Sequence, residues 1–172
     1  MSFLIASFRD VADGLQPGQF AVGGRRRAES LDELDAVHRQ LLDRPITQTL
    51  GIIGPDGRPS LTPMWFDHEH DKILVNTAAH RPKCAWIRSN PRLTSLLVDP
   101  GNPYHWVQIK HTVEAERREW EAGGEYVTRQ LDRIWSKYTG KPPPYGLRDP
   151  SIDEKRVLFI CRIDRIATFG RP

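Results

Sequence analysis

The chain has few cysteines and no strong excess of charge of one sign. Its 172 residues include only two cysteines, Cys84 and Cys161, which lie far apart and lack the spacing of metal ligands. We therefore expect two reduced thiols and no disulfide, as in a cytoplasmic protein. Lys and Arg total 25 against 22 Asp and Glu, a formal charge of +3. So mild an excess does not favour nucleic acid as a partner.

The chain also lacks the segments that carry proteins into or across membranes. No apolar run approaches the roughly 18 residues that a membrane span needs. The apolar residues 1–8 have no basic segment before them and are followed at once by Arg9 and Asp10, unlike a signal peptide. We expect no membrane span and a cytoplasmic location. A Gly-x-Ser-x-Gly sequence, a Walker loop and a dinucleotide glycine fingerprint are absent as well.

Length and composition favour one domain that is rich in strands. A chain of 172 residues can bury a single sizeable core. The apolar fraction is 38%, with 13 glycines and 14 prolines, which suits short strands and turns better than a helical array. The predicted fold class is therefore mainly β, or α+β. We divide the chain into an N-terminal arm, residues 1–29, and a main globular domain, residues 30–172.

Local patterns predict where the helices and strands lie. The segment Ser30–Glu33 is a capping box, so one amphipathic helix should begin there and end before Pro45. A turn at Gly54–Gly57 joins the first two strands in a hairpin. The first three strands should form a meander that could close into a barrel. Strands are predicted over 47–53, 61–66, 73–77, 93–98, 104–114 and 156–163, and further helices over 82–89 and 125–139.

Two cations mark a candidate phosphate site. Arg81 and Lys83 flank Pro82 at the first turn of a predicted helix, where free backbone amides and the helix dipole favour an anion. Thr77, at the end of the preceding strand, could add a hydroxyl, whereas Arg88 lies about two turns further on. On pattern alone, such a pair is more often a solvated helix face, so both interpretations stay open.

A second candidate site surrounds a proline inside an apolar strand. Pro63 interrupts the run Leu61–Phe66, which indicates an edge strand or a bulge. Backbone groups freed there could bind the polar edge of a planar heterocycle, with Met64 or Trp65 packed on its face, although core packing explains either side chain alone. Trp106 could border a pocket or fill an interface. We interpret His68–His70 as an exposed polar turn and not as a metal site.

Five short motifs follow one another at fixed spacing along the chain. They are Asp56-Gly57-Arg58-Pro59, Thr62-Pro63-Met64-Trp65-Phe66, Leu74-Val75-Asn76-Thr77, Arg81-x-Lys83 and Asn90-Pro91-Arg92. Together they resemble the pyridoxamine-phosphate-oxidase-like split-barrel family, and within it the actinobacterial flavin/deazaflavin oxidoreductases, especially the branch that uses coenzyme F-420. The resemblance covers residues 45–118 well and the C-terminal strand loosely.

The resemblance implies a six-stranded antiparallel split barrel with flanking helices. It implies a homodimer with one cofactor in each of two grooves between protomers, and a small-molecule substrate. No dedicated catalytic side chain is implied, because the cofactor ring carries out hydride transfer. Arg81 and Lys83 would hold the cofactor phosphate. The implied cofactor-binding set is Pro63, Met64, Trp65, Thr77, Arg81, Pro82, Lys83, Trp86 and Trp106.

The same branch resemblance implies the deazaflavin F-420, with FMN as the alternative. Positive charge for the glutamate tail of F-420 could come from residues 25–27, all arginine, and from Lys110. Trp86 stands where the branch usually has an asparagine, and His111 where it usually has a glycine. These two departures motivate a third hypothesis, a carrier that binds a cofactor or a haem-like ligand without turnover.

Overall fold

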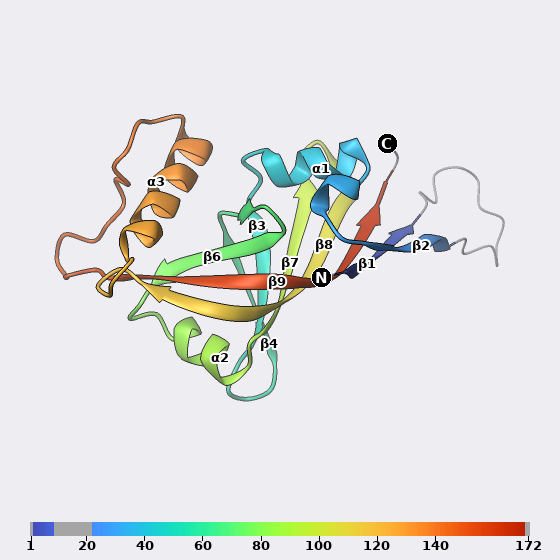
Figure 1. Ribbon diagram of the computed structural model, residues 1–172. Coiled ribbons are helices and arrows are strands. Elements are labelled where there is room, and N and C mark those ends of the chain that lie inside the picture. Colours follow the sequence, from blue (N-terminus) through green and yellow to red (C-terminus); the bar gives the residue numbers. More distant parts are fainter. Residues whose placement is uncertain (1, 9–21, 171–172) are drawn as a thin grey trace.

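The structure, a computed structural model, describes residues 2–8 and 22–170. In these ranges nine strands form one mixed sheet, with three α-helices outside it (Figure 1). None of these helices is long and apolar enough to cross a membrane. The strands are β1 (Phe3–Phe8), β2 (Val22–Ala28), β3 (Gln48–Ile53), β4 (Pro59–Met64), β5 (Asp67–Glu69), β6 (Lys72–Ala78), β7 (Arg92–Asp99), β8 (Asn102–Arg118) and β9 (Arg156–Phe169). The helices are α1 (Ala36–Asp43), α2 (Lys83–Ser89) and α3 (Glu125–Thr139).

Strand β9 organises the sheet. One of its edges pairs with β8 along nearly its whole length, whereas the other edge pairs first with β6, over residues 156–162, and then with β1, over residues 165–169. The remaining order is β8-β7-β3-β4, with β5 beside β6 and β2 beside β1. Strands β4 and β6 do not pair, so the sheet stays open between them. This is the expected split barrel.

Three expectations about the sheet are wrong. The sheet has nine strands in the described residues, not six, and the pairing of β1 with β9 is parallel. The predicted meander does not form, because β6 pairs with β9 instead of β4. Side chains bind the backbone where the chain leaves β4: Gln48 donates to the Trp65 carbonyl at 3.1 Å, and the Phe66 amide donates to the Tyr138 hydroxyl at 2.8 Å.

The predicted first helix is divided into two parts. Ser30 makes the expected capping box with Glu33, but it caps a 3-10 turn, Leu31–Glu33. The backbone then becomes extended at Leu34, and α1 begins at Ala36. The predicted apolar stripe continues across this break and packs on the core as expected. Its buried residues are Leu31, Leu34, His38, Leu41 and Leu42. Helix α1 ends before Pro45, also as predicted.

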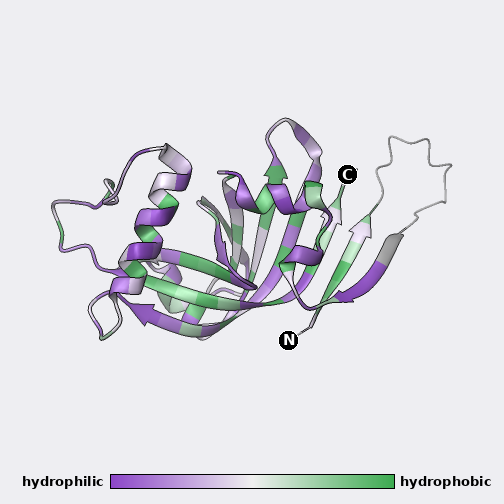
Figure 2. Cartoon of the chain, turned by 45° about the horizontal axis from the view of Figure 1, so that its top comes forward, coloured by the Kyte–Doolittle hydropathy of each residue, from purple (hydrophilic) through white to green (hydrophobic). Residues whose placement is uncertain are grey.

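The other predicted helices and strands are found, with bounds that differ by a few residues. The exposed polar turn predicted at His68–His70 is wrong in part, because residues 67–69 form β5 and the His68 side chain is only 11% exposed and contacts Asp43 at 3.0 Å. Pro82 directly precedes α2. Helix α3 ends at Gly140, whose φ of 68° is the left-handed conformation that glycine adopts readily. Figure 2 shows α3 as an amphipathic helix, with apolar residues interspersed among polar ones. Strands β8 and β9 extend beyond the predicted 104–114 and 156–163 because they pair with each other almost throughout.

The described parts of the predicted arm join the sheet. Residues 1 and 9–21 of that arm lie outside the described residues. Strand β1 pairs with β9 and β2 pairs with β1, which places both at one end of the molecule, away from α3 (Figure 1). Phe3, Ile5 and Ala28 are buried in the main core. The division at residue 29 stays a prediction.

Candidate functional site

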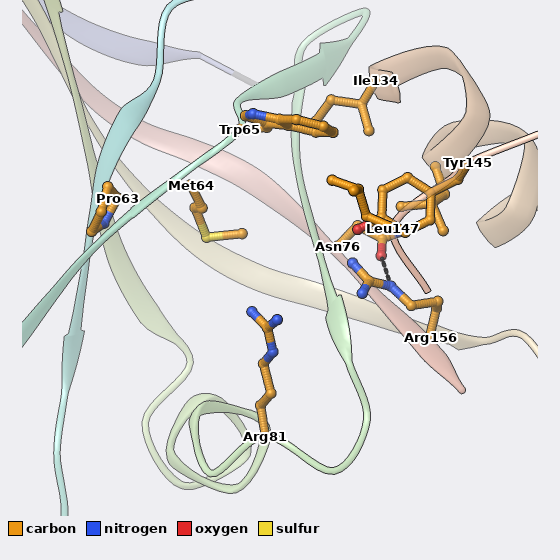
Figure 3. Close-up of a pocket in the computed structure, with 10 residues that line it drawn as sticks. Pro63, Met64, Trp65, Asn76, Arg81, Ile134, Tyr145, Leu147 and Arg156 are labelled. Atoms are coloured by element: carbon orange, nitrogen blue, oxygen red, sulfur yellow. Dashed lines mark hydrogen bonds between the residues drawn. The ribbon is translucent and has the colours of Figure 1, made fainter. Parts of the chain in front are cut away.

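A cavity of about 220 Å³ lies where the sheet is open between β4 and β6. Figure 3 shows Met64 and Trp65 from the end of β4, Arg81 before α2 and Arg156 at the start of β9 around it. Helix α3 and the segment after it complete the walls. The lining residues are Pro63, Met64, Trp65, Asn76, Arg81, Leu131, Ile134, Tyr145, Leu147 and Arg156. Four predicted site residues, Pro63, Met64, Trp65 and Arg81, therefore come together here.

The cations Arg81 and Lys83 have no carboxylate within ion-pair distance in the described chain. Arg81 points into the cavity (Figure 3), whereas Lys83 Nζ donates a 3.1 Å hydrogen bond to Thr62 Oγ1 on β4. Burial, and after it the Arg81 guanidinium, lower the pKa of Lys83. Two cations without an ion-pair partner in the described residues fit an anionic group such as a phosphate.

The backbone of α2 contributes less to an anion site than the sequence indicated. The amides of Cys84 and Ala85 already bond to the carbonyls of Arg81 and Pro82, both at 3.0 Å. The helix has only seven residues. Side-chain charge, and not the helix terminus, is therefore what this corner of the cavity offers an anion.

Thr77 lies on the other face of β6 from the cavity. Successive side chains of a strand point to opposite faces, and the neighbouring Asn76 lines the cavity. Thr77 shares its face with the core residues Ile73 and Val75, is 2% exposed, and its hydroxyl has no partner among the described residues. The structure does not bring Thr77 to the cavity wall.

An aromatic cluster fixes Trp65 in place. Its ring stacks on Tyr138 with centroids 5.0 Å apart and planes at 16°. Trp135 lies 6.2 Å away and Tyr145 6.4 Å away by the same measure. Such contacts restrict the indole to one orientation, so Trp65 presents a fixed surface to the cavity.

A buried polar chain, which sequence reasoning missed, begins at the cavity. Arg156 Nε donates to Asn76 Oδ1 at 2.9 Å, and Asn76 Nδ2 donates to Gln130 Oε1 at 2.8 Å. Gln130 Nε2 continues to Asp67 Oδ2 at 2.8 Å. The one local signal was Asn76, a polar residue in the apolar run Ile73–Thr77. Partners so far apart in sequence leave no local pattern.

The remaining predicted site residues lie outside this cavity. Trp86 borders a second hollow of about 510 Å³, between the β3–β4 turn and the end of α2. Trp106 stacks on Phe169 with centroids 5.7 Å apart, and Phe8 of β1 lies 6.3 Å from it. Pro82 is exposed and precedes α2. Their roles in cofactor binding stay predictions.

His111 belongs to the core. It is fully buried, Ser95 Oγ lies 2.8 Å from its Nε2, and burial lowers the pKa of His111 to about 3. The imidazole is therefore neutral at pH 7. In residues 2–8 and 22–170, no group of three or more His, Cys, Asp or Glu side chains could hold a metal.

The basic residues proposed for an anionic tail are divided between the two faces of the sheet. Arg27 lies opposite Leu4, Leu4 opposite Arg165, and Arg165 opposite Lys110, so the three cations share one row across four strands. Arg25 lies two residues along from Arg27 on the same face. Arg26 points the other way and pairs with Glu33 at 3.2 Å.

The comparisons place this architecture in a known family. The sequence model of the pyridoxamine 5'-phosphate oxidase family matches residues 34–170, while no curated protein matches the chain in sequence. An F420 reductase is similar in structure, with a TM-score of 0.61 and 24% identity over 77% of this chain and 98% of its own. A conserved hypothetical protein from Mycobacterium tuberculosis has a TM-score of 0.57 and 26% identity over 76% of this chain and 81% of its own.

A third structure with this fold has a different role. The heme storage protein from Vibrio cholerae has a TM-score of 0.55 and 10% identity, over 77% of this chain and 92% of its own. At such an identity the likeness shows the fold alone. The family match covers most of the chain and does not depend on any one of these structures. The chain therefore belongs to the pyridoxamine 5'-phosphate oxidase family.

Proposed function

We propose that this protein is a cytoplasmic, homodimeric oxidoreductase that binds the deazaflavin coenzyme F-420 and reduces a small hydrophobic acceptor. The observation that carries the proposal is the pair Arg81 and Lys83, two cations with no carboxylate partner in the described residues, beside a cavity at the open side of the barrel. A phosphate group bound there would supply the missing negative charge. The family membership supports a flavin-like ligand.

The protein's own part in the reaction is binding, orientation and exclusion of water. Arg81 and Lys83 would hold the phosphate, while Met64 and Trp65 would border the ring system. The bound coenzyme supplies hydride transfer. Leu131 and Ile134 add apolar surface to the cavity wall, which would help to exclude water from the reacting region. No side chain of this chain is required to act as acid, base or nucleophile.

FMN is the alternative cofactor, because it offers the same phosphate to the same two cations. The likeness to an F420 reductase supports the deazaflavin. The carrier hypothesis receives less support, although a heme storage protein shares the fold. Trp86 and His111, which motivated it, both lie outside the cavity, and no histidine lines it in the described residues.

The test of the phosphate site is a titration of protein freed of ligand with F-420 and, separately, with FMN. Intrinsic fluorescence of the five tryptophans provides the signal. The double variant Arg81→Ala/Lys83→Ala should weaken binding by about 3 kcal/mol or more, roughly a hundredfold, through loss of charge-assisted hydrogen bonds. Tighter binding of FMN than of F-420 by the unaltered protein would overturn the choice of cofactor.

The matched control removes two exposed cations that are not among the residues lining the cavity. Arg58→Ala/Lys155→Ala deletes the same formal charge from exposed positions, so it reports any effect of net charge alone. It should leave the affinity within about twofold, because exposed charges act weakly at physiological salt. Equal affinity in a folded Arg81→Ala/Lys83→Ala variant would refute the phosphate assignment. Binding of F-420 without reduction of any enone, quinone or nitroaromatic compound would favour the carrier.

A further inference from the structure

We infer that the cavity is also the binding site of the acceptor, and that Arg156 recognises it by donating a hydrogen bond to a neutral carbonyl oxygen. The inference rests on the proposed function, since a carbonyl compound bound here would be the molecule that is reduced. Arg156 is 7% exposed and lines the cavity. Its two bound nitrogens are Nε, which donates to Asn76, and Nη1, which donates to Glu154 at 2.7 Å.

The third nitrogen of this guanidinium, Nη2, has no hydrogen-bond partner among the described residues. Because Arg156 lines the cavity, a ligand oxygen bound there can accept a hydrogen bond from Nη2 in place of water. Figure 3 shows the Arg156 guanidinium at the cavity, joined to Asn76 by its hydrogen bond. Because Asn76 and Glu154 hold the other two nitrogens, the donor is already oriented before a ligand arrives.

The charge around Arg156 favours a neutral ligand over an anion. Glu154 Oε1 lies 2.7 Å from Arg156 Nη1, and both side chains are more than nine-tenths buried, so this ion pair is electrically balanced. A carboxylate on the ligand would face Glu154 as a second buried negative charge. The positive charge that remains in the cavity belongs to Arg81, which the proposed phosphate would neutralise.

The other walls favour a planar, apolar body. Tyr145 lies with its ring centroid 5.5 Å from the Arg156 guanidinium carbon. Leu131, Ile134 and Leu147 add aliphatic surface. Flat ligands gain from contact with aromatic rings as well as from burial. The acceptor class is therefore a planar carbonyl compound such as an enone or a quinone.

The test compares 1-indanone with indane, two ligands of nearly the same shape of which only the first has a carbonyl. Binding is measured by calorimetry in the absence of cofactor, so it can fail or succeed independently of F-420 binding. The unaltered protein should bind 1-indanone at least about tenfold more tightly, as expected for a hydrogen bond from a charged donor. Similar affinities for the two ligands, or no binding of either, would overturn the inference.

The variants remove the donor without leaving a charge unpaired. Glu154→Gln/Arg156→Met deletes both members of the buried ion pair and should reduce the preference to within about threefold. Arg162→Met/Asp164→Asn deletes an exposed pair on the same strand, joined at 3.0 Å, and should keep the full preference. A tenfold preference that persists in the first variant would show that Arg156 is not the donor.

A second variant locates the site even if the buried pair proves necessary for folding. Leu147 lines the cavity and is 58% exposed, so Leu147→Ala should fold normally. This variant should weaken the binding of both ligands by a similar factor, about threefold, through lost apolar contact. Unchanged affinity for both ligands would place the binding site elsewhere on the protein.

Discussion

Lys83 Nζ donates a hydrogen bond to Thr62 Oγ1 over 3.1 Å, which joins the start of α2 to strand β4. The two residues are 21 positions apart and belong to two different sequence motifs of the family. Their contact holds a half-buried cation against β4, one residue before the cavity-lining Pro63, although Lys83 itself does not line the cavity. Burial of this ammonium lowers the pKa of Lys83, so the charged side chain destabilises the folded protein to some extent.

We expect Lys83→Met to change how the free energy of unfolding depends on pH. The pKa of Lys83 is lowered from 10.5 in the folded protein, so the unfolded chain binds the proton more tightly. Stability of the unaltered protein should then rise as the pH increases through the folded pKa towards 10.5. Lys83→Met should lack this rise, and denaturant unfolding between pH 7 and pH 10 measures it. Lys155→Met, at an exposed position, should retain it.

His111 should make the protein sensitive to mild acid. Its pKa falls from 6.5 to about 3 on burial, so the unfolded chain takes up the proton first and stability decreases as the pH drops from 6.5 towards 3. The slope contributed is up to about 1.4 kcal/mol per pH unit. Between pH 7 and pH 5, the unaltered protein should lose about 2 kcal/mol more than His111→Gln. Equal losses would contradict the assignment, and the exposed His80→Gln serves as control.

The hydroxyl of Tyr138 should contribute far more to the free energy of unfolding than an ordinary surface hydroxyl. It accepts from the Phe66 amide at 2.8 Å and donates to the Ile46 carbonyl at 2.5 Å. Tyr138→Phe leaves both half-buried backbone groups without this partner and should lower the free energy of unfolding by about 2 kcal/mol. Tyr104→Phe removes a hydroxyl from a residue that is 61% exposed and should change it little. Thermal and denaturant unfolding compare the two.

The basic row on the sheet should distinguish the two cofactors. Lys110 and Arg165 lie directly opposite each other, an arrangement of like charges that costs stability unless an anion lies between them. Lys110→Ala/Arg165→Ala should weaken F-420 binding about tenfold and leave FMN binding unchanged, because FMN lacks the glutamate tail. Parallel fluorescence titrations measure both affinities. Equal effects on the two cofactors would exclude a tail site here.

Neighbouring residues and local periodicity determined much of this protein. The capping box at Ser30–Glu33, the turn before β4 and the left-handed Gly140 each depend on a few adjacent residues. Arg81 and Lys83 were predictable as a pair because two positions separate them. The position of Pro63 on an edge strand, β4, likewise follows from the sequence. Interactions of this range leave their pattern within a short window.

Only the tertiary structure decided which strands meet and what completes the cavity. Arg156 and Asn76 are 80 positions apart, and they meet because β6 pairs with β9 instead of with β4. Periodicity records which face of a strand is buried but not which strand lies beside it. Neighbours are selected by burial of the whole core, in which β9 carries both β6 and β1 on one edge. The sequence alone therefore indicated the cations Arg81 and Lys83, whereas only the fold showed the cavity walls and the donor Arg156.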